Sequence, residues 1–165
     1  MKRLAAILSI AALVNAPCLL AGDIDGSLGS VEPDLTSPPA TAHAPAPGKR
    51  VRQVNKNYAT TQVRHLLYLP TDWVKGKKYP VIVEYEGNQY KSSPGTAEGS
   101  NLGYGISGGK GVIWLCLPYI SKDHSRNEVT RWGDVDASVD YCKQTVRQVC
   151  ADYGGDPSRL FIAGF

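Results

Sequence analysis

The sequence lacks three features that would each point to a class of protein. The net charge is only +3, and the basic residues are scattered rather than gathered into a stripe. We therefore expect no nucleic-acid partner, because proteins that bind nucleic acid concentrate lysine and arginine on one face. No histidine or cysteine has the spacing of a metal site, so we expect neither a metal nor a cofactor. No apolar run is long enough to span a bilayer.

The N-terminus has the pattern of a targeting segment. Lys2 and Arg3 form a positively charged start, and the apolar run from Leu4 to Val14 follows. This run is too short for a membrane-spanning helix and is typical of a cleaved signal peptide. We expect residues 1–22 to be removed, the protein to be secreted or periplasmic, and no stable membrane insertion to remain after cleavage.

Cysteine is scarce, and its positions limit the possible disulfides. If Cys18 leaves with the signal peptide, Cys116, Cys142 and Cys150 remain. Cys142 and Cys150 lie about 12 Å apart along one expected helix, which is too far for them to pair with each other. One of them could pair with Cys116 or with a cysteine outside this sequence, and unpaired buried thiols are the other possibility.

Residues 23–48 contain five prolines among small residues and show no periodicity. Such a segment buries too little apolar surface to offset the entropy of ordering it, so it is interpreted as a disordered linker. The folded part is expected to begin near Lys49, and residues 49–165 are expected to form a partial α/β domain.

The remaining pattern predicts an α/β fold with a mostly parallel sheet and flanking helices. Strands are expected near residues 62–69, 79–86 and 112–117, and a fourth precedes the C-terminus. Asp134 is a plausible N-cap and Gly154 a fitting C-terminal residue for a helix between them. Strands joined in this way pair in parallel through right-handed crossovers. The helix face expected to pack on the sheet comprises Val135, Val139, Cys142, Val146, Val149 and Tyr153.

The last ten residues read D-P-S-R-L-F-I-A-G-F, a turn followed by an apolar strand and a glycine. With the preceding helix, this string resembles the approach to the nucleophile elbow of the α/β-hydrolase family, whose motif is G-x-S-x-G. Within the family, it is similar to secreted esterases of the polyhydroxybutyrate-depolymerase and feruloyl-esterase kind. Gly164 and Phe165 match the first two positions of the motif, so the resemblance implies a nucleophilic serine just after Phe165.

The same resemblance implies that the catalytic acid and histidine lie further downstream. The sequence is therefore interpreted as the N-terminal half of such a hydrolase, ending one residue before the serine. On its own it is expected to be inactive. Its last strand would be central in the family's strand order, so an apolar sheet edge should be left bare here.

The resemblance also implies an oxyanion hole after an early strand. These esterases place a His-Gly pair there, followed by a backbone N–H that points at the developing oxyanion. Glu86-Gly87-Asn88 occupies this place, so Gly87 and Asn88 are the candidates, with the Asn88 amide as donor. Glu86 departs from the family, because a carboxylate opposes an oxyanion unless it points away or is paired.

Two other stretches have the residue types of a catalytic site without the right context. Gly105-Ile106-Ser107-Gly108-Gly109 satisfies G-x-S-x-G, but no strand signal precedes it and no helix signal follows. Asp123-His124-Ser125 places three triad residue types side by side, whereas triads assemble in space. We expect neither to be catalytic. Trp114, Tyr119 and Trp132 are expected to be packing residues.

The function expected for the full-length protein is hydrolysis of a small or polymeric carboxylic ester through an acyl-enzyme. Two alternatives stay open. The D-P-x-R approach also occurs in serine peptidases of the prolyl-oligopeptidase type. The third possibility is a non-catalytic secreted binding protein on the same scaffold, which Glu86 at the oxyanion corner would favour.

Overall fold

The computed structural model describes residues 35–91 and 93–164. The expected signal peptide, linker residues 23–34 and Phe165 lie outside these ranges. None of the helices in the described part is both long enough and apolar enough to cross a membrane.

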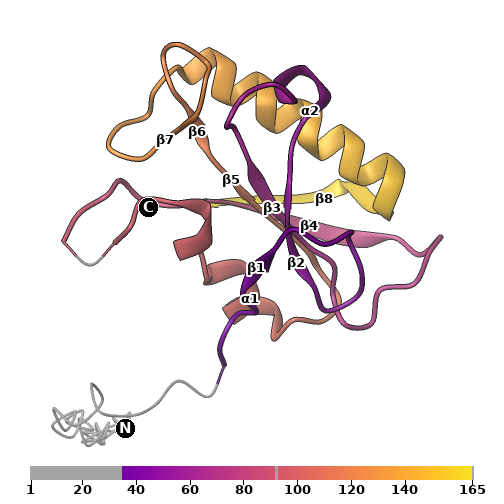
Figure 1. Ribbon diagram of the computed structural model, residues 1–165. Coiled ribbons are helices and arrows are strands. Elements are labelled where there is room, and N and C mark those ends of the chain that lie inside the picture. The colour runs from indigo at the N-terminus through magenta and orange to yellow at the C-terminus, as the bar shows by residue number, and fades with distance from the viewer. Residues whose placement is uncertain (1–34, 92, 165) are drawn as a thin grey trace, which may run out of the picture. The chain divides into compact units, whose positions relative to one another are not determined.

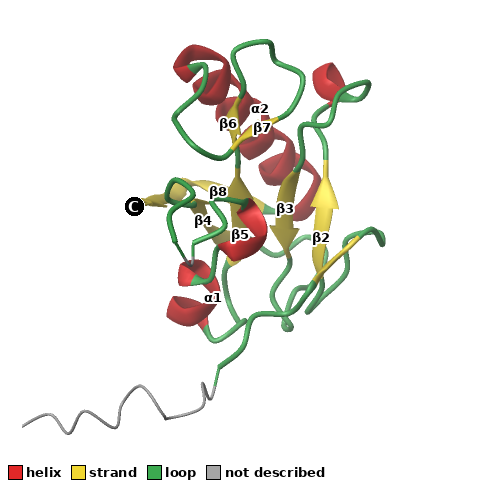
Figure 2. Cartoon of the chain, turned by 60° about the vertical axis from the view of Figure 1, so that its left-hand side comes forward, coloured by secondary structure: helices red, strands yellow, loops and turns green. Residues whose placement is uncertain are grey.

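Six strands form one mixed sheet in the spatial order β1-β2-β3-β5-β4-β8 (Figures 1 and 2). Strand β4 pairs in parallel with both β5 and β8, whereas β3 runs antiparallel to β5 and to β2. The expected α/β fold with a mostly parallel central region is confirmed. The six strands are β1 (Ala40–Thr41), β2 (Arg50–Gln53), β3 (His65–Tyr68), β4 (Tyr79–Tyr85), β5 (Ile113–Leu117) and β8 (Gly155–Gly164). A separate antiparallel pair consists of β6 (Tyr119–Ile120) and β7 (Asn127–Glu128).

Two helices lie on opposite faces of the sheet, α2 (Val135–Tyr153) on one and the short α1 (Leu102–Ser107) on the other (Figure 1). Two 3-10 turns, η2 (Lys56–Tyr58) and η3 (Ala97–Gly99), complete the described elements. Because strand side chains alternate between faces, the sheet contributes to two cores. The α2 side contains Leu67, Val81, Val83, Ile113, Leu115, Tyr141 and Val149, and the α1 side contains Leu66, Tyr68, Ile82, Ala97, Trp114 and Cys116.

The ends of α2 lie where the sequence predicts them. Asp134 is the N-cap, and its Oδ1 accepts a hydrogen bond of 3.0 Å from the Ala137 N–H. Gly154 ends the helix with a φ of +78°, and its N–H donates to the Val149 carbonyl. A Cβ on Gly154 would lie 2.3 Å from the Lys77 carbonyl oxygen, so both the backbone angle and the available space require glycine.

The expected packing face of α2 is wrong at its first two positions. Val135 and Val139 are 52% and 43% exposed, whereas the polar residues Ser138 and Thr145 are buried. These hydroxyls are satisfied: Ser138 Oγ accepts from the Ile120 N–H at 2.9 Å, and Thr145 Oγ1 bonds to the Asn55 amide. An apolar periodicity misses a helix face whose buried positions are paired polar groups.

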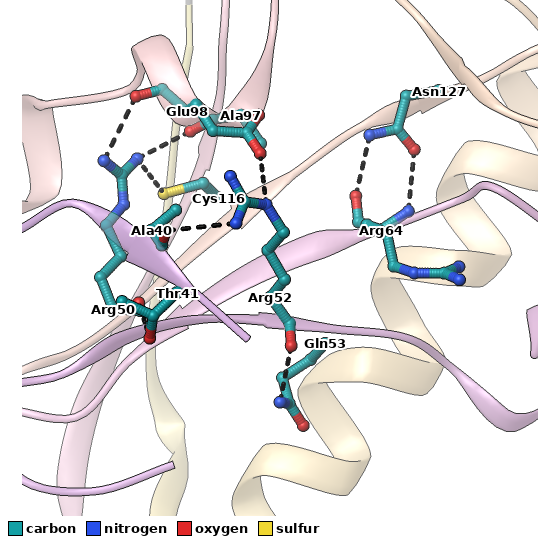
Figure 3. A network of polar contacts seen from close by, with 10 residues as sticks. All are labelled: Ala40, Thr41, Arg50, Arg52, Gln53, Arg64, Ala97, Glu98, Cys116 and Asn127. Atoms are coloured by element: carbon teal, nitrogen blue, oxygen red, sulfur yellow. Dashed lines mark hydrogen bonds and ion pairs between the residues drawn. The ribbon is translucent and has the colours of Figure 1, made fainter. Parts of the chain in front are cut away.

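The ordered sheet also begins earlier than the expected boundary at Lys49. Within the segment interpreted as a linker, β1 pairs in parallel with β2, and the Gly48 N–H donates to the Leu69 carbonyl at 2.9 Å. Arg52 reaches back to the Ala40 carbonyl at 3.1 Å (Figure 3). Backbone pairing fixes this proline-rich stretch without burying much apolar surface, which is why composition alone did not predict it.

Candidate functional site

The carboxyl ends of β4 and β8 lie side by side. The parallel register runs from Val81 opposite Leu160 to Tyr85 opposite Gly164. Ligands of open parallel sheets bind beyond the carboxyl ends of the strands. The fold therefore brings Gly164 next to the segment Glu86–Asn88, which follows β4 directly. These residues, chosen from the sequence, share one edge of the sheet, and their catalytic roles stay predictions.

Gly164 lies unusually close to its neighbouring strand. A Cβ built there would be 3.2 Å from the Tyr85 carbonyl oxygen and 3.4 Å from the Tyr85 Cβ. A side chain at position 164 would press on the β4 backbone, so glycine lets the two strand ends meet closely.

The turn after β4 exposes backbone donors. Gly87 is half-buried and Asn88 is exposed, and both line a surface hollow together with Glu86 and Ser93. Neither the Gly87 nor the Asn88 N–H donates to an acceptor among the described residues, whereas the next amide, Gln89 N–H, bonds to the Val129 carbonyl at 2.6 Å. Two N–H groups without an acceptor among the described residues have, at this position, the chemistry of an anion-stabilising site.

Glu86 is turned away from the α2 face and is paired. Its two carboxylate oxygens accept hydrogen bonds from Ser93 Oγ at 3.2 Å and Ser100 Oγ at 3.3 Å. Along β4, the alternation of side chains places Glu84 and Glu86 toward α1 and Tyr85 toward α2. The carboxylate that departs from the family pattern is thus held against residues 93–100.

A second carboxylate, on Glu84, organises the segment beside the site. It is 2% exposed, and its oxygens accept from the backbone N–H groups of Asn101, Leu102 and Gly103 and from the Trp114 indole N–H. These four bonds lie between 2.8 and 3.1 Å and fix the first turn of α1 to the sheet. The sequence analysis missed this role, although a single acid inside an apolar strand is a usable signal.

Arg50 holds the other end of the same segment. Its guanidinium is buried and donates to the carbonyls of Ala97 and Glu98 at 2.7 and 3.2 Å (Figure 3). It also donates to the Ser100 carbonyl at 2.9 Å and lies 4.5 Å from the centre of the Trp114 ring. Among the buried side-chain nitrogen and oxygen atoms of the described residues, only the Nε of Arg50 lacks a hydrogen-bond partner. Arg50 and Glu84 together hold residues 97–103 rigidly next to the turn that carries Gly87 and Asn88.

An aromatic pocket, lined by Tyr85, Tyr119, Trp132, Val139, Cys142 and Ile162, lies at the same edge on the α2 side. Its volume is about 420 Å³. The rings of Tyr85 and Tyr119 stack, with centroids 5.1 Å apart and planes 29° apart. The expectation that Trp132 is a packing residue is wrong, because its side chain is 64% exposed. Periodicity could not find this pocket, because its aromatic residues come from separate segments.

The structure does not assemble either of the two motif-like stretches into a catalytic site. Ser107 is the last residue of α1, which follows the 3-10 turn η3 and not a strand. Its Oγ donates to the Gly103 carbonyl at 2.8 Å. Ser125 and Ser121 both donate to Asp123, whereas His124 bonds to Asp134 Oδ2 at 3.0 Å. No serine hydroxyl bonds to His124 among the described residues.

The thiols of the described residues are neutral. Cys116, Cys142 and Cys150 are free. Burial raises the pKa of Cys116 to about 12 and also raises the pKa values of the other two. A neutral thiol is a poor nucleophile and a poor metal ligand. Within residues 35–91 and 93–164, no group of three or more His, Cys, Asp or Glu side chains is arranged to hold a metal ion.

No protein-family model and no curated protein matches the chain. Among solved structures, it is similar to a thermophilic esterase from the Planctomycetes species Thermogutta terrifontis, in its native and its propionate-bound forms. In both cases the identity is 22% and the TM-score 0.47, and the match covers 68% of this chain and 39% or 40% of the esterase. The chain thus spans about two fifths of the length of these esterases. A likeness of this degree is no basis for assigning a function.

Proposed function

We propose that this chain belongs to an exported serine hydrolase that cleaves carboxylic esters through an acyl-enzyme. The observation that carries the proposal is the side-by-side placement of two strand ends. After β4 stand two backbone N–H groups that have no acceptor among the described residues, and the close-packed Gly164 ends β8. A serine placed after Phe165 would stand at the carboxyl edge of a parallel strand, where a nucleophile elbow presents its hydroxyl.

In the proposed reaction, the serine hydroxyl attacks the ester carbonyl while a histidine takes its proton. The carbonyl oxygen becomes an oxyanion, and the Asn88 N–H donates a hydrogen bond to it. The alcohol then leaves with the proton, and water hydrolyses the acyl-enzyme by the same route. One such donor stabilises the transition state by about 3–4 kcal/mol. The serine, the histidine and the acid are assigned to polypeptide that follows Phe165.

The finer parts of the proposal rest on the sequence. The N-terminal pattern favours a signal peptide and a secreted or periplasmic location. The D-P-S-R-L-F-I-A-G-F string favours esterases of the polyhydroxybutyrate-depolymerase and feruloyl-esterase kind. The substrate would be a small or polymeric ester.

The first test is the coding sequence after Phe165. The proposal requires Ser-x-Gly to follow at once, and any other continuation overturns it. A protein extended through the whole reading frame should hydrolyse 4-nitrophenyl acetate and should react covalently with a fluorophosphonate probe. Cleavage of peptide amides in preference to esters would favour a peptidase instead. If the extended protein is folded but has neither activity, the remaining hypothesis is a non-catalytic binding protein.

A matched pair of variants tests the proposed donor in the extended protein. Asn88→Pro removes the backbone N–H, whereas Asn88→Ala changes the side chain and keeps the N–H. We expect kcat to fall about 100-fold or more in Asn88→Pro and to stay near the parent value in Asn88→Ala. Fluorophosphonate labelling and circular dichroism check that the proline variant is folded. Equal loss in both variants would contradict a backbone role.

A further inference from the structure

The aromatic pocket is built from three parts of the chain that are distant in sequence. Tyr85 is the last residue of β4, Tyr119 opens β6 just after β5, and Trp132 stands three residues before α2. Their side chains line one cavity at the carboxyl edge of the parallel strands. In the chain, Tyr85 is followed by Glu86, Gly87 and Asn88.

Trp132 is exposed although its backbone neighbours are fixed. Gly133 has a φ of +59°, and a Cβ on it would lie 2.0 Å from the Ile120 carbonyl oxygen. The next residue, Asp134, donates its N–H to the same carbonyl at 2.7 Å. The indole of Trp132 is thus presented to solvent from a rigid turn, which is an arrangement that lowers the entropic cost of binding.

The walls of the pocket suit an uncharged ligand. Val135, Val139 and Ile162 contribute apolar surface, and Cys142 lines the same cavity. Burial raises the pKa of Tyr85 far above its ordinary value, so the phenol stays neutral. Among the described residues, the one cation that lines the cavity is Lys143, and its Nζ lies 3.9 Å from Asp140 Oδ1. A mostly apolar cavity of about 420 Å³ is in the size range of small-molecule sites.

We propose that the aromatic pocket binds the aromatic ring of an uncharged aryl ester, with Trp132 as its side wall and the Tyr85–Tyr119 stack as its base. Aromatic rings favour offset or edge-to-face contacts with one another, which an alicyclic ring of similar size cannot make. The ester part of this inference rests on the proposed function. The preference for an aromatic ring rests on the pocket alone.

The test is a fluorescence titration of the full chain at low concentration. Trp132 is 64% exposed, whereas Trp73 is half-buried and Trp114 is fully buried, so the Trp132 emission responds most to a ligand. Phenyl acetate should shift and saturate the Trp132 emission, and cyclohexyl acetate should bind between about two- and tenfold more weakly, from the strength of an aromatic pair. The responding component should be missing in Trp132→Phe. Equal affinity for the two esters, or no saturable response, would overturn the inference.

A pair of valine variants locates the binding site while keeping the Trp132 reporter. Val139→Asp places a carboxylate in the pocket wall, and it should weaken phenyl acetate binding at least about fivefold. Val74→Asp adds the same group at an exposed valine that does not line the pocket, and it should leave the affinity unchanged. Equal effects of the two variants would place the ligand elsewhere and overturn the inference.

Toluene separates this inference from the proposed function, because it has the ring without the ester. If toluene binds saturably but the extended protein hydrolyses no ester, the pocket does bind an aromatic ring and the esterase proposal is wrong. If the extended protein hydrolyses phenyl and cyclohexyl esters equally well and the Trp132 emission does not respond, the inference about the pocket is wrong and the esterase proposal stands.

Discussion

The sheet has one densely packed end and one open end. In β3 and β5, every residue is buried, and helix, loop and neighbouring strands cover both faces. In β8, Leu160, Phe161 and Ile162 are 40%, 58% and 73% exposed, and β8 is the last strand in the sheet order. The open end also includes an apolar groove between α2 and β8, lined by Val83, Val146, Cys150, Leu160 and Ile162.

This difference shows that an apolar strand sequence does not by itself make a core. The run from Leu160 to Ile162 is as apolar as that from Ile113 to Leu115, yet only the second run has partners on both sides. The bare apolar edge expected from the sequence is therefore present in the described residues. Stability should depend on the packed end, and association on the open end.

The largest effect is expected from the buried carboxylate in the packed end. Glu84→Ala would leave four N–H donors without their acceptor and should lower the free energy of unfolding by about 3–5 kcal/mol. Glu84→Gln keeps one acceptor oxygen and should lose less. Urea denaturation followed by circular dichroism measures both. A loss below about 1 kcal/mol in Glu84→Ala would show that the segment 97–103 contributes little to the packed end.

The next effect is a loss of stability in acid caused by His65. Burial lowers its pKa from 6.5 to about 3, and its Nδ1 lies 2.8 Å from the Tyr141 hydroxyl. The unfolded chain therefore takes up a proton below pH 6.5 while the folded chain does not. The contribution is fully present above pH 6.5 and is lost as the pH falls toward 3. By pH 4 the loss should reach about 3 kcal/mol.

Urea denaturation at a series of pH values measures this loss. His65→Phe removes the titrating group, so its stability should depend much less on pH between about 6.5 and 4. Asp156, at the start of β8, is a comparison from the open end. Hydrogen bonds from Ser158, with Arg159, lower its pKa to about 2. The contribution of Asp156 to stability is lost only as the pH falls from about 4 toward 2, so Asp156 adds no pH dependence near pH 5.5. If the free energy of unfolding changed equally with pH near about 5.5 in His65→Phe and in the parent, the His65 assignment would be contradicted.

A smaller difference is expected between matched leucines at the two ends. Leu115→Ala deletes a fully buried side chain in β5 and should cost about 2–4 kcal/mol. Leu160→Ala makes the same change in β8, where the side chain is 40% exposed, and should cost less than about 1 kcal/mol. Thermal and urea denaturation compare the two variants directly. Equal losses would mean that β8 is covered in solution.

The smallest effect on stability, but a clear one on association, is expected from a charge on β8. Ile162→Lys should change the free energy of unfolding by less than about 0.5 kcal/mol. It should also reduce self-association, because a lysine on an edge strand disfavours edge-to-edge pairing. Light scattering coupled to size-exclusion chromatography measures the association. Val74→Lys, at an exposed turn, is the control and should associate like the parent.

The sequence predicted those parts of the fold that depend on local rules. The terminal strand follows from its apolar run after Asp156-Pro157, and the ends of α2 follow from a capping aspartate and a glycine. The placement of Gly87 and Asn88 beside Gly164 follows from parallel pairing. Their catalytic roles stay predictions.

What the sequence could not supply depends on contacts between distant residues. Ser138 and Thr145 face the core because Ile120 and Asn55 provide partners for their hydroxyls, and no periodicity encodes those partners. Strand β1 is ordered through backbone pairing with β2. The aromatic pocket combines Tyr85, Tyr119 and Trp132 only after the sheet has formed.

Trp114 has a guanidinium above its ring and a carboxylate at its indole nitrogen, and it is completely buried. Opposite charges on two sides of one chromophore subject it to an oriented electric field. Its absorption and emission energies should therefore change as soon as either charge moves, even while the strands stay paired. The Trp114 spectrum should therefore report when residues 97–103, which Arg50 and Glu84 hold beside the candidate site, become loose.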